Sequence, residues 1–153
     1  MARHDRPRLS RRLGDSAGQA LLESAIITPL LLFVTFGIVD FGWLFYSNLA
    51  LESGVSQAVR YAVTGQAMDG LSREESIKTV MRRAAPALTI EDDDFRFSHL
   101  VGGAWVDGMG GPGDIEKLTV TYSHHILVFT PFFRDAAIDL RVESAMKNEE
   151  RFE

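Results

Sequence analysis

The stretch GDSAGQALLESAIITPLLLF, residues 14–33, decides the fold of the N-terminal part of this chain. It places the carboxylate of Glu23 at the start of an apolar run that also contains Pro29. No residue from Ala25 to Val39 is charged, and the apolar character resumes after Asp40. At about 1.5 Å per residue, a helix over about residues 21–46 is long enough to cross the roughly 30 Å hydrocarbon core of a bilayer. The pattern therefore predicts a single membrane-spanning helix.

The charges of this 153-residue chain are unevenly distributed. Residues 1–18 hold five arginines against two aspartates, a net charge of +3, so the remainder carries −8 because the whole chain carries −5. Since a positively charged flank stays in the cytoplasm, we expect residues 1–18 to be a basic cytoplasmic leader and the body to lie outside. The basic tip lacks aromatic residues, and we expect no nucleic-acid partner.

Two other interpretations of the apolar run stay open. A cleaved secretory signal would carry its small residues after the apolar core, whereas GDSAG (14–18) precedes it and FGWLFY (41–46) follows it. A buried helix of a soluble protein would accommodate Glu23 and Asp40 more easily, but it would leave the arginine-rich tip unexplained. The chain has no cysteine, which excludes disulfides, thiol nucleophiles and cysteine-based zinc sites.

Several motifs in the first 65 residues occur together in a known order. They are Glu23, TPLLLF (28–33), FGIVDFG (36–42), LFY (44–46) and AVRYA (58–62). In this order they resemble the N-terminal region of TadE-like proteins, minor pilin-like components of tight-adherence pili. Two departures are Asp40, where the family usually has Glu, and VSQAVRYA (55–62) in place of a Gly-Ala-Arg core.

The resemblance implies a processing site and a set of partners. A prepilin peptidase would cut on the cytoplasmic side between Gly18 and Gln19, which makes Glu23 the fifth residue of the mature chain. Gly14 is the competing glycine, but its fifth follower is Gln19, which carries no charge. The other implied partners are pilin-like subunits (a TadF-like protein and a major pilin) and the inner-membrane assembly platform. Within the membrane helix, the expected packing residues are Pro29, Gly37, Asp40 and Gly42.

A physical argument for Glu23 stands beside the resemblance. Cleavage would create an α-amino group, and such groups have pKa values near 7.7–8.0 and are mostly protonated at neutral pH. A carboxylate and an ammonium at a membrane edge partly offset each other's desolvation. Residues 19 and 23 lie on one helical face, so the pair can form within a chain or with a neighbouring subunit. The simpler alternative is that Glu23 only marks the water-exposed end of the helix.

The remaining sequence predicts an extracytoplasmic α+β domain over residues 67–153. The long-helix region, residues 19–66, continues past the membrane with an apolar stripe. The helix itself is expected from about Ala17 to Val63, with Gly65 as its terminator. A second helix is expected over 71–85, with Ser72 and Glu75 as a capping box and Pro86 at its end. Alternating apolar residues predict strands over 95–101, 117–129 and 137–147, the last two paired antiparallel. We expect a small antiparallel sheet packed on the second half of the long helix, as in pilins.

The remaining motifs favour structural roles over metal, calcium or phosphate binding. His124 and His125 are adjacent, so their side chains point to opposite faces of a strand and cannot share one metal. EDDD (91–94) lacks the spacing of a calcium-binding EF-hand loop and predicts a solvated turn. The glycine-rich residues 101–114 lack a phosphate-binding motif and predict a flexible hairpin loop. FTPFF (129–133) contains three phenylalanines that either join the core or contact a partner or the membrane surface: Phe129, Phe132 and Phe133.

These observations together predict a protein that acts by assembly and is not an enzyme. We expect no cofactor and no metal, and no motif joins a nucleophile to its base. The predicted function is that of a minor pilin-like protein needed to assemble a tight-adherence pilus from the bacterial inner membrane. The alternative is an uncleaved, single-pass envelope protein with a binding or sensing domain.

Overall fold

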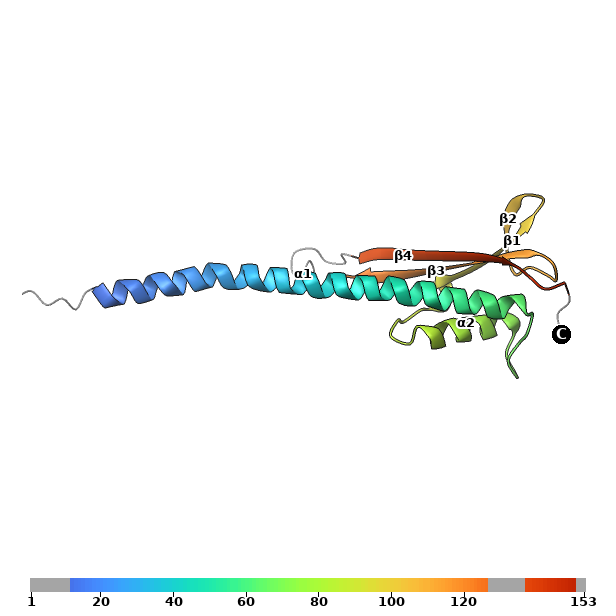
Figure 1. Ribbon diagram of the computed structural model, residues 1–153, viewed down its shortest axis with the longest axis horizontal. Helices are drawn as coiled ribbons and strands as arrows, with labels where there is room; N and C mark the ends of the chain where they lie inside the picture. The colour runs from blue at the N-terminus through green and yellow to red at the C-terminus, as the bar shows by residue number, and fades with distance from the viewer. Residues whose placement is uncertain (1–11, 127–136, 151–153) are drawn as a thin grey trace, which may run out of the picture. The chain divides into compact units, whose positions relative to one another are not determined.

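The computed structural model describes residues 12–126 and 137–150 of the chain (Figure 1). The chain divides into two compact units, Met1–Val39 and Asp40–Glu153. Helix α1 (Arg12–Val63) belongs to both units. The long N-terminal helix and its predicted end at Val63 are therefore confirmed, while its start lies a few residues before the expected one.

The first unit consists, among its described residues, of the N-terminal part of α1. Its large apolar side chains between Leu21 and Val39 are each 48–73% exposed. Among the described residues there is one helix long and apolar enough to cross a membrane, Gly18–Val63, and none of its most apolar window is buried. This exposure distinguishes the segment from the buried core helix of a soluble protein, because such a helix would be covered by its own chain.

The second unit contains a four-stranded antiparallel sheet. Its strands are β1 (Phe95–Val101), β2 (Ala104–Asp107), β3 (Ile115–His125) and β4 (Ala137–Lys147), and their order across the sheet is β2-β1-β3-β4. The predicted antiparallel pairing of the last two strands is confirmed, with Val120 opposite Val142 near the centre of the ladder. The predicted fold class, a long helix with a small antiparallel sheet, is confirmed as well.

One hydrophobic core joins the second half of α1, helix α2 (Arg73–Ala84) and the inner face of the sheet (Figure 1). The apolar stripe of α1 that the sequence predicts is buried there from Leu51 to Ala62. The sheet contributes alternate residues of two neighbouring strands, since side chains on a strand alternate between faces. The core residues are Leu51, Val55, Ala58, Val59, Ala62, Ile77, Met81, Ala85, Leu88, Ile90, Phe95, Phe97, Leu118 and Val120.

The ends of both helices follow the predicted local signals. Ser72 accepts a hydrogen bond from the backbone of Glu75, and the Glu75 carboxylate accepts one from the backbone of Ser72, which forms the expected capping box. Gly65 follows the end of α1 with a φ of 70°, and its backbone donates to Ala62 O at 3.1 Å. Glycine reaches this left-handed conformation without the steric cost of a side chain.

The glycine-rich segment 101–114 differs from its prediction as a flexible loop. It contains β2, because Gly102 and Gly103 adopt φ values of 57° and 89° and reverse the chain tightly between β1 and β2. The acidic residues 92–94 form a short 3-10 helix, η1 (Asp92–Asp94). Strand β3 begins at Ile115, two residues before the predicted start, because its pairing with β4 extends to Lys147. Residues 127–129 of the predicted strand lie outside the described residues.

Candidate functional site

The candidate processing and register residues lie in the exposed part of α1. Gly18, Gln19 and Glu23 are all solvent-exposed, and an added Cβ at Gly18 would meet no atom within 4 Å. The helix runs through the Gly18–Gln19 bond, because α1 begins at Arg12. Residues 19 and 23 are one helical turn apart on the same face. The Glu23 side chain makes no hydrogen bond and no ion pair with any residue that the structure describes.

Two features modify the backbone of α1 within its apolar run. Pro29 lies inside the helix and has no N–H, so the carbonyl of Ala25 loses its normal hydrogen-bond donor. Thr35 donates its hydroxyl proton to Leu31 O at 2.8 Å, which satisfies a polar side chain within the helix itself. In lipid, this internal bond removes the need for another partner for Thr35.

The small residues Gly37 and Gly42 leave open space beside α1. A Cβ added at either glycine would meet no atom within 4 Å. Glycines of this kind let a second helix approach closely, because no side chain separates the two backbones. The structure thus keeps both positions accessible to a neighbouring molecule. Their use as packing residues stays a prediction, as does that of Pro29.

Asp40 is located differently from these glycines. It is the first residue of the second unit and is only 7% exposed. Ser47 and Leu51, seven and eleven residues later, are fully buried on the same side of the helix. Asp40 therefore begins the helical face that packs within its own domain.

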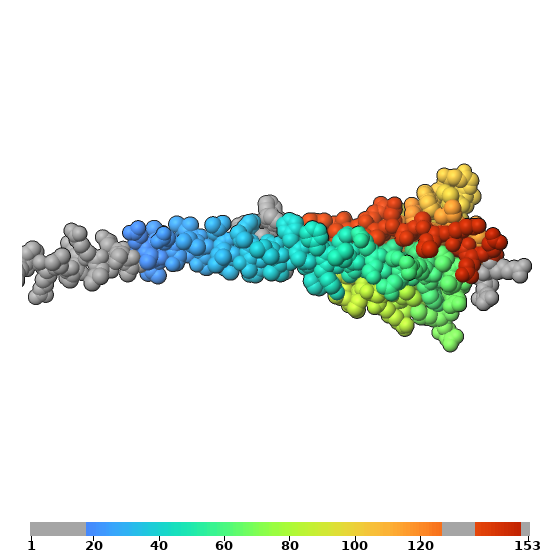
Figure 2. Space-filling model, viewed as in Figure 1, coloured from blue at the N-terminus to red at the C-terminus, as the bar shows by residue number. Residues whose placement is uncertain are grey.

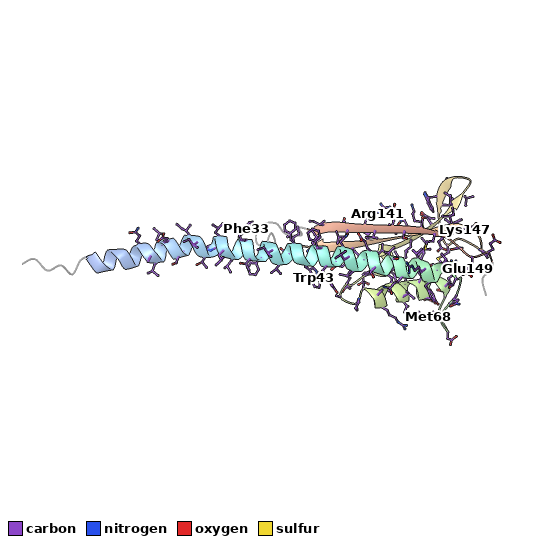
Figure 3. The ribbon with its side chains drawn as sticks, in the orientation of Figure 1. Phe33, Trp43, Met68, Arg141, Lys147 and Glu149 are labelled. Carbon is purple, nitrogen blue, oxygen red and sulfur yellow. The ribbon has the colours of Figure 1, made fainter. Side chains whose placement is uncertain are left out.

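Aromatic side chains follow at the point where the apolar run ends. The rings of Trp43 and Tyr46 lie 5.3 Å apart between centroids, and both side chains are exposed (Figure 3). Tryptophan and tyrosine with an apolar ring and a polar group favour the membrane–water interface. Trp43 and Tyr46 are therefore suited to an interfacial aromatic belt.

The match to a known family falls on this helix. Residues 18–60 match the family model TadE-like protein. The match starts at Gly18, before the expected cut, and ends within the last turn of α1. It confirms the family resemblance found from the sequence motifs, and it associates the chain with tight-adherence pili in general terms. No curated protein and no solved structure matches the chain.

The end of α1, at Ala62, is joined to the sheet by a buried polar cluster that the sequence did not predict. Arg73 donates to Glu116 at 2.7 Å and to the carbonyls of Ala62 and Gly110, both at 2.8 Å. Asn148 donates to Glu116 at 3.1 Å and to Gly111 O at 2.9 Å. This polar cluster (Arg73, Glu116 and Asn148) connects the end of α1, the start of α2, the glycine-rich segment and both long strands.

The histidines and acidic residues take the positions expected of structural residues. His124 is buried and His125 is exposed, as predicted for neighbours on opposite faces of a strand. Asp92 accepts a hydrogen bond from Arg82 at 2.6 Å, and this bond lowers the pKa of the Asp92 carboxyl. Within residues 12–126 and 137–150, no group of three His, Cys, Asp or Glu side chains is arranged to hold a metal ion. Phe129, Phe132 and Phe133 lie outside the described residues.

Proposed function

We propose that this chain is a minor pilin-like protein that acts in the assembly of a tight-adherence pilus. The observation that carries the proposal is the position of Glu23. It is the fifth residue after Gly18, where the TadE-like match begins, and it lies on an exposed apolar helix with no described partner. The protein would act through helix packing and subunit contacts.

The N-terminal part of α1 would anchor the protein in the inner membrane. The proposed span, about residues 21–46, rises about 39 Å as a helix, which is long enough to cross the roughly 30 Å hydrocarbon core. The arginines of residues 1–18 would hold the N-terminus in the cytoplasm, with the second unit on the other side. Lipid or neighbouring helices would then cover the apolar side chains that the chain itself leaves exposed.

Glu23 would set the axial position of neighbouring helices. After cleavage, the ammonium of Gln19 on one subunit would pair with the carboxylate of Glu23 on the next. Because these residues are four apart, the pairing would offset the two helices by about 6 Å. A carboxylate in or near hydrocarbon is costly without such a partner, so this offset would be favoured over others. The proposed partners are a prepilin peptidase, TadF-like and major pilin subunits, and the assembly platform.

One observation favours the alternative of an uncleaved anchored envelope domain. The Gly18–Gln19 bond lies inside α1, and a peptidase can act on a helical bond only after the helix opens locally. The bond is six residues from the helix start at Arg12, so only the first turns must open. In the alternative, Glu23 would mark the water-exposed helix end, and no offset between helices would follow.

Intact-mass measurement of membrane-extracted protein from a host with a prepilin peptidase tests the processing step. We expect a mature chain that begins at Gln19, and Gly18→Leu should retain residues 1–18. Gly14→Leu is the matched control, because it changes the competing glycine and should be cleaved normally. An intact Met1 chain in the host with the peptidase would contradict processing at Gly18.

A second experiment tests the register function of Glu23. Glu23→Ala and Glu23→Gln should both be cleaved but should lower the number of pili per cell, since each removes the charge. Glu52→Ala is the matched control, because Glu52 is an exposed acid on the same helix outside the apolar run. Normal pilus numbers in the Glu23 variants would contradict the proposed pairing.

A further inference from the structure

The sheet of the second unit has two outer strands, β2 and β4, and each pairs with one described neighbour. All four residues of β2 are exposed, and so are most residues of the eleven-residue β4. The end of the β1–β2 hairpin projects from the rest of the unit in Figure 2. Free strand edges present unpaired backbone groups and accept a further strand readily. The structure therefore offers two edges to other chains.

Residues that lie opposite one another on neighbouring strands form a row across the sheet. At the two ends of one such row, the edge strands β2 and β4 both carry apolar side chains. Val106 lies opposite His99, His99 opposite Glu116, and Glu116 opposite Met146. These four residues form one row on the inner face, with Val106 44% exposed at one end and Met146 40% exposed at the other. A second copy placed beside the first at the same height would bring Met146 of one against Val106 of the next.

The residues next to Val106 and Met146 on the two edge strands are Trp105 and Lys147, and both lie on the outer face. Trp105 is 44% exposed on β2, and Lys147 follows Met146 on β4 (Figure 3). Trp105 already has the ammonium of Lys117 at 4.3 Å from its ring centroid, which shows that this ring accepts a cation. In the arrangement above, Lys147 of one copy would lie opposite Trp105 of the next. Both pairs of edge residues would thus be complementary in a single register.

Strand direction favours this pairing over the pairing of two β4 strands. Arg73 contacts both Ala62 at the end of α1 and Glu116 at the start of β3, which fixes the direction of β4 relative to this part of α1. In copies anchored in one membrane, α1 leads into the second unit from the same side. The β4 strands of these copies therefore run in the same direction. Antiparallel pairing of two β4 strands would need one copy inverted. Strands β2 and β4 of upright copies are antiparallel already, because every neighbour in the sheet is antiparallel.

We infer that copies of this chain associate side by side in the membrane, with β2 of one copy paired to the C-terminal half of β4 of the next. The contact goes beyond the proposed pilus function but rests on the membrane anchoring proposed there. A pairing of four residues buries far less than the roughly 1,200 Å² of a stable interface. The contact is therefore weak between free molecules, and anchoring in one membrane supports it by raising the effective concentration.

Cysteine cross-linking in membranes tests this contact, because the chain has no native cysteine. The variant that carries both Val106→Cys and Met146→Cys is treated with a short bifunctional thiol reagent in carbonate-washed membranes. We expect a ladder of dimers, trimers and higher species, because each copy offers both edges. Each single variant should stay monomeric. The matched control is Val106→Cys with Ile138→Cys, since Ile138 is about 26 Å from Met146 along the same face of β4.

The remaining outcomes separate the contact from the anchoring. Trp105→Ala in the cross-linking background should lower the ladder about tenfold, as expected for a central aromatic contact. A chain retained in washed membranes without a ladder would overturn the contact alone, whereas a chain washed off would overturn the anchoring and the contact with it. A third double variant, Ile138→Cys with Met146→Cys, tests antiparallel pairing of two β4 strands. If this variant forms a cross-linked dimer and Val106→Cys with Met146→Cys forms no ladder, the proposed contact is overturned in favour of β4–β4 pairing.

Discussion

Removing Arg73 should be the most damaging single change to the second unit. Its guanidinium binds Glu116 at 2.7 Å, and the two side chains are only 16% and 5% exposed. Arg73→Met would leave the Glu116 carboxylate buried without its cation and would also remove the donors to the Ala62 and Gly110 carbonyls. Breaking a buried pair from one side costs about 3–5 kcal/mol. This is a large part of the total stability of a typical domain.

Urea unfolding of the full chain in detergent micelles, followed by tryptophan fluorescence and circular dichroism, measures this loss. With a slope of about 1.5 kcal/mol per molar urea, the midpoint should fall by about 2–3 M. Arg83→Ala is the matched control, because Arg83 is an exposed arginine on the same helix, and it should change stability by less than about 0.5 kcal/mol.

A double variant separates the ion pair from simple packing. Arg73→Met with Glu116→Leu should recover most of the lost stability, because replacing both charges with apolar groups leaves no unpaired carboxylate. Equal midpoints for Arg73→Met and Arg83→Ala would refute the reasoning. A double variant as unstable as Arg73→Met would show that hydrogen bonds to the carbonyls, and not the unpaired charge, account for the loss.

Three further predictions concern α1 and α2. Gly54→Leu should lower stability by about 1–3 kcal/mol in thermal melts, because a Cβ at Gly54 would already lie 2.4 Å from the buried Met81 Sδ. Ser72→Ala should cost about 1 kcal/mol through loss of the helix cap. Hydrogen bonds from the backbone N–H and the hydroxyl of Ser72 hold the pKa of the Glu75 carboxyl below its ordinary value. The same variant removes the hydroxyl bond and should raise this pKa, as an NMR titration would show. Because that folded pKa is lowered, the contribution of the Glu75 carboxylate is present above its unfolded pKa and is lost as the pH falls through the folded pKa. The stability difference between wild type and Ser72→Ala should therefore narrow in acid without vanishing, because the bond from Glu75 N–H to Ser72 Oγ does not titrate. Gly65→Val should cost about 1–2 kcal/mol in thermal melts, because its φ of 70° is unfavourable for any side chain.

The sequence predicted the features that depend on local signals. The capping box of Ser72 and Glu75, the terminator Gly65 and the alternation of β3 and β4 each follow from residues close together in the chain, and all are present. The candidate residues Gly18, Gln19 and Glu23 came from their spacing and a resemblance that the family match confirms. These signals needed no knowledge of tertiary packing.

The polar cluster could not be predicted in the same way. Arg73 and Glu116 are 43 residues apart, and each alone resembles an ordinary surface charge. Glu116 lies on the inner face of β3, where alternation would favour an apolar residue, and Arg73 makes its burial possible. Strand β2 was missed because its four residues stand among glycines. Composition alone therefore suggested a loop, whereas pairing with β1 makes a strand.

The two parts of α1 show how a helix with one continuous backbone can serve two different environments. Between Gly18 and Val39 its apolar side chains are exposed on every side, whereas from Asp40 onward a single face is buried in its own domain. Apolar contacts in a membrane do not favour a neighbouring helix over lipid, because lipid chains are equally apolar. Specific association must then depend on polar groups and on close backbone contacts. Thr35 is already satisfied by Leu31 O. Glu23, the only charged residue between Gly18 and Val39, would therefore determine where a neighbour binds, and the open glycines would determine how closely it approaches.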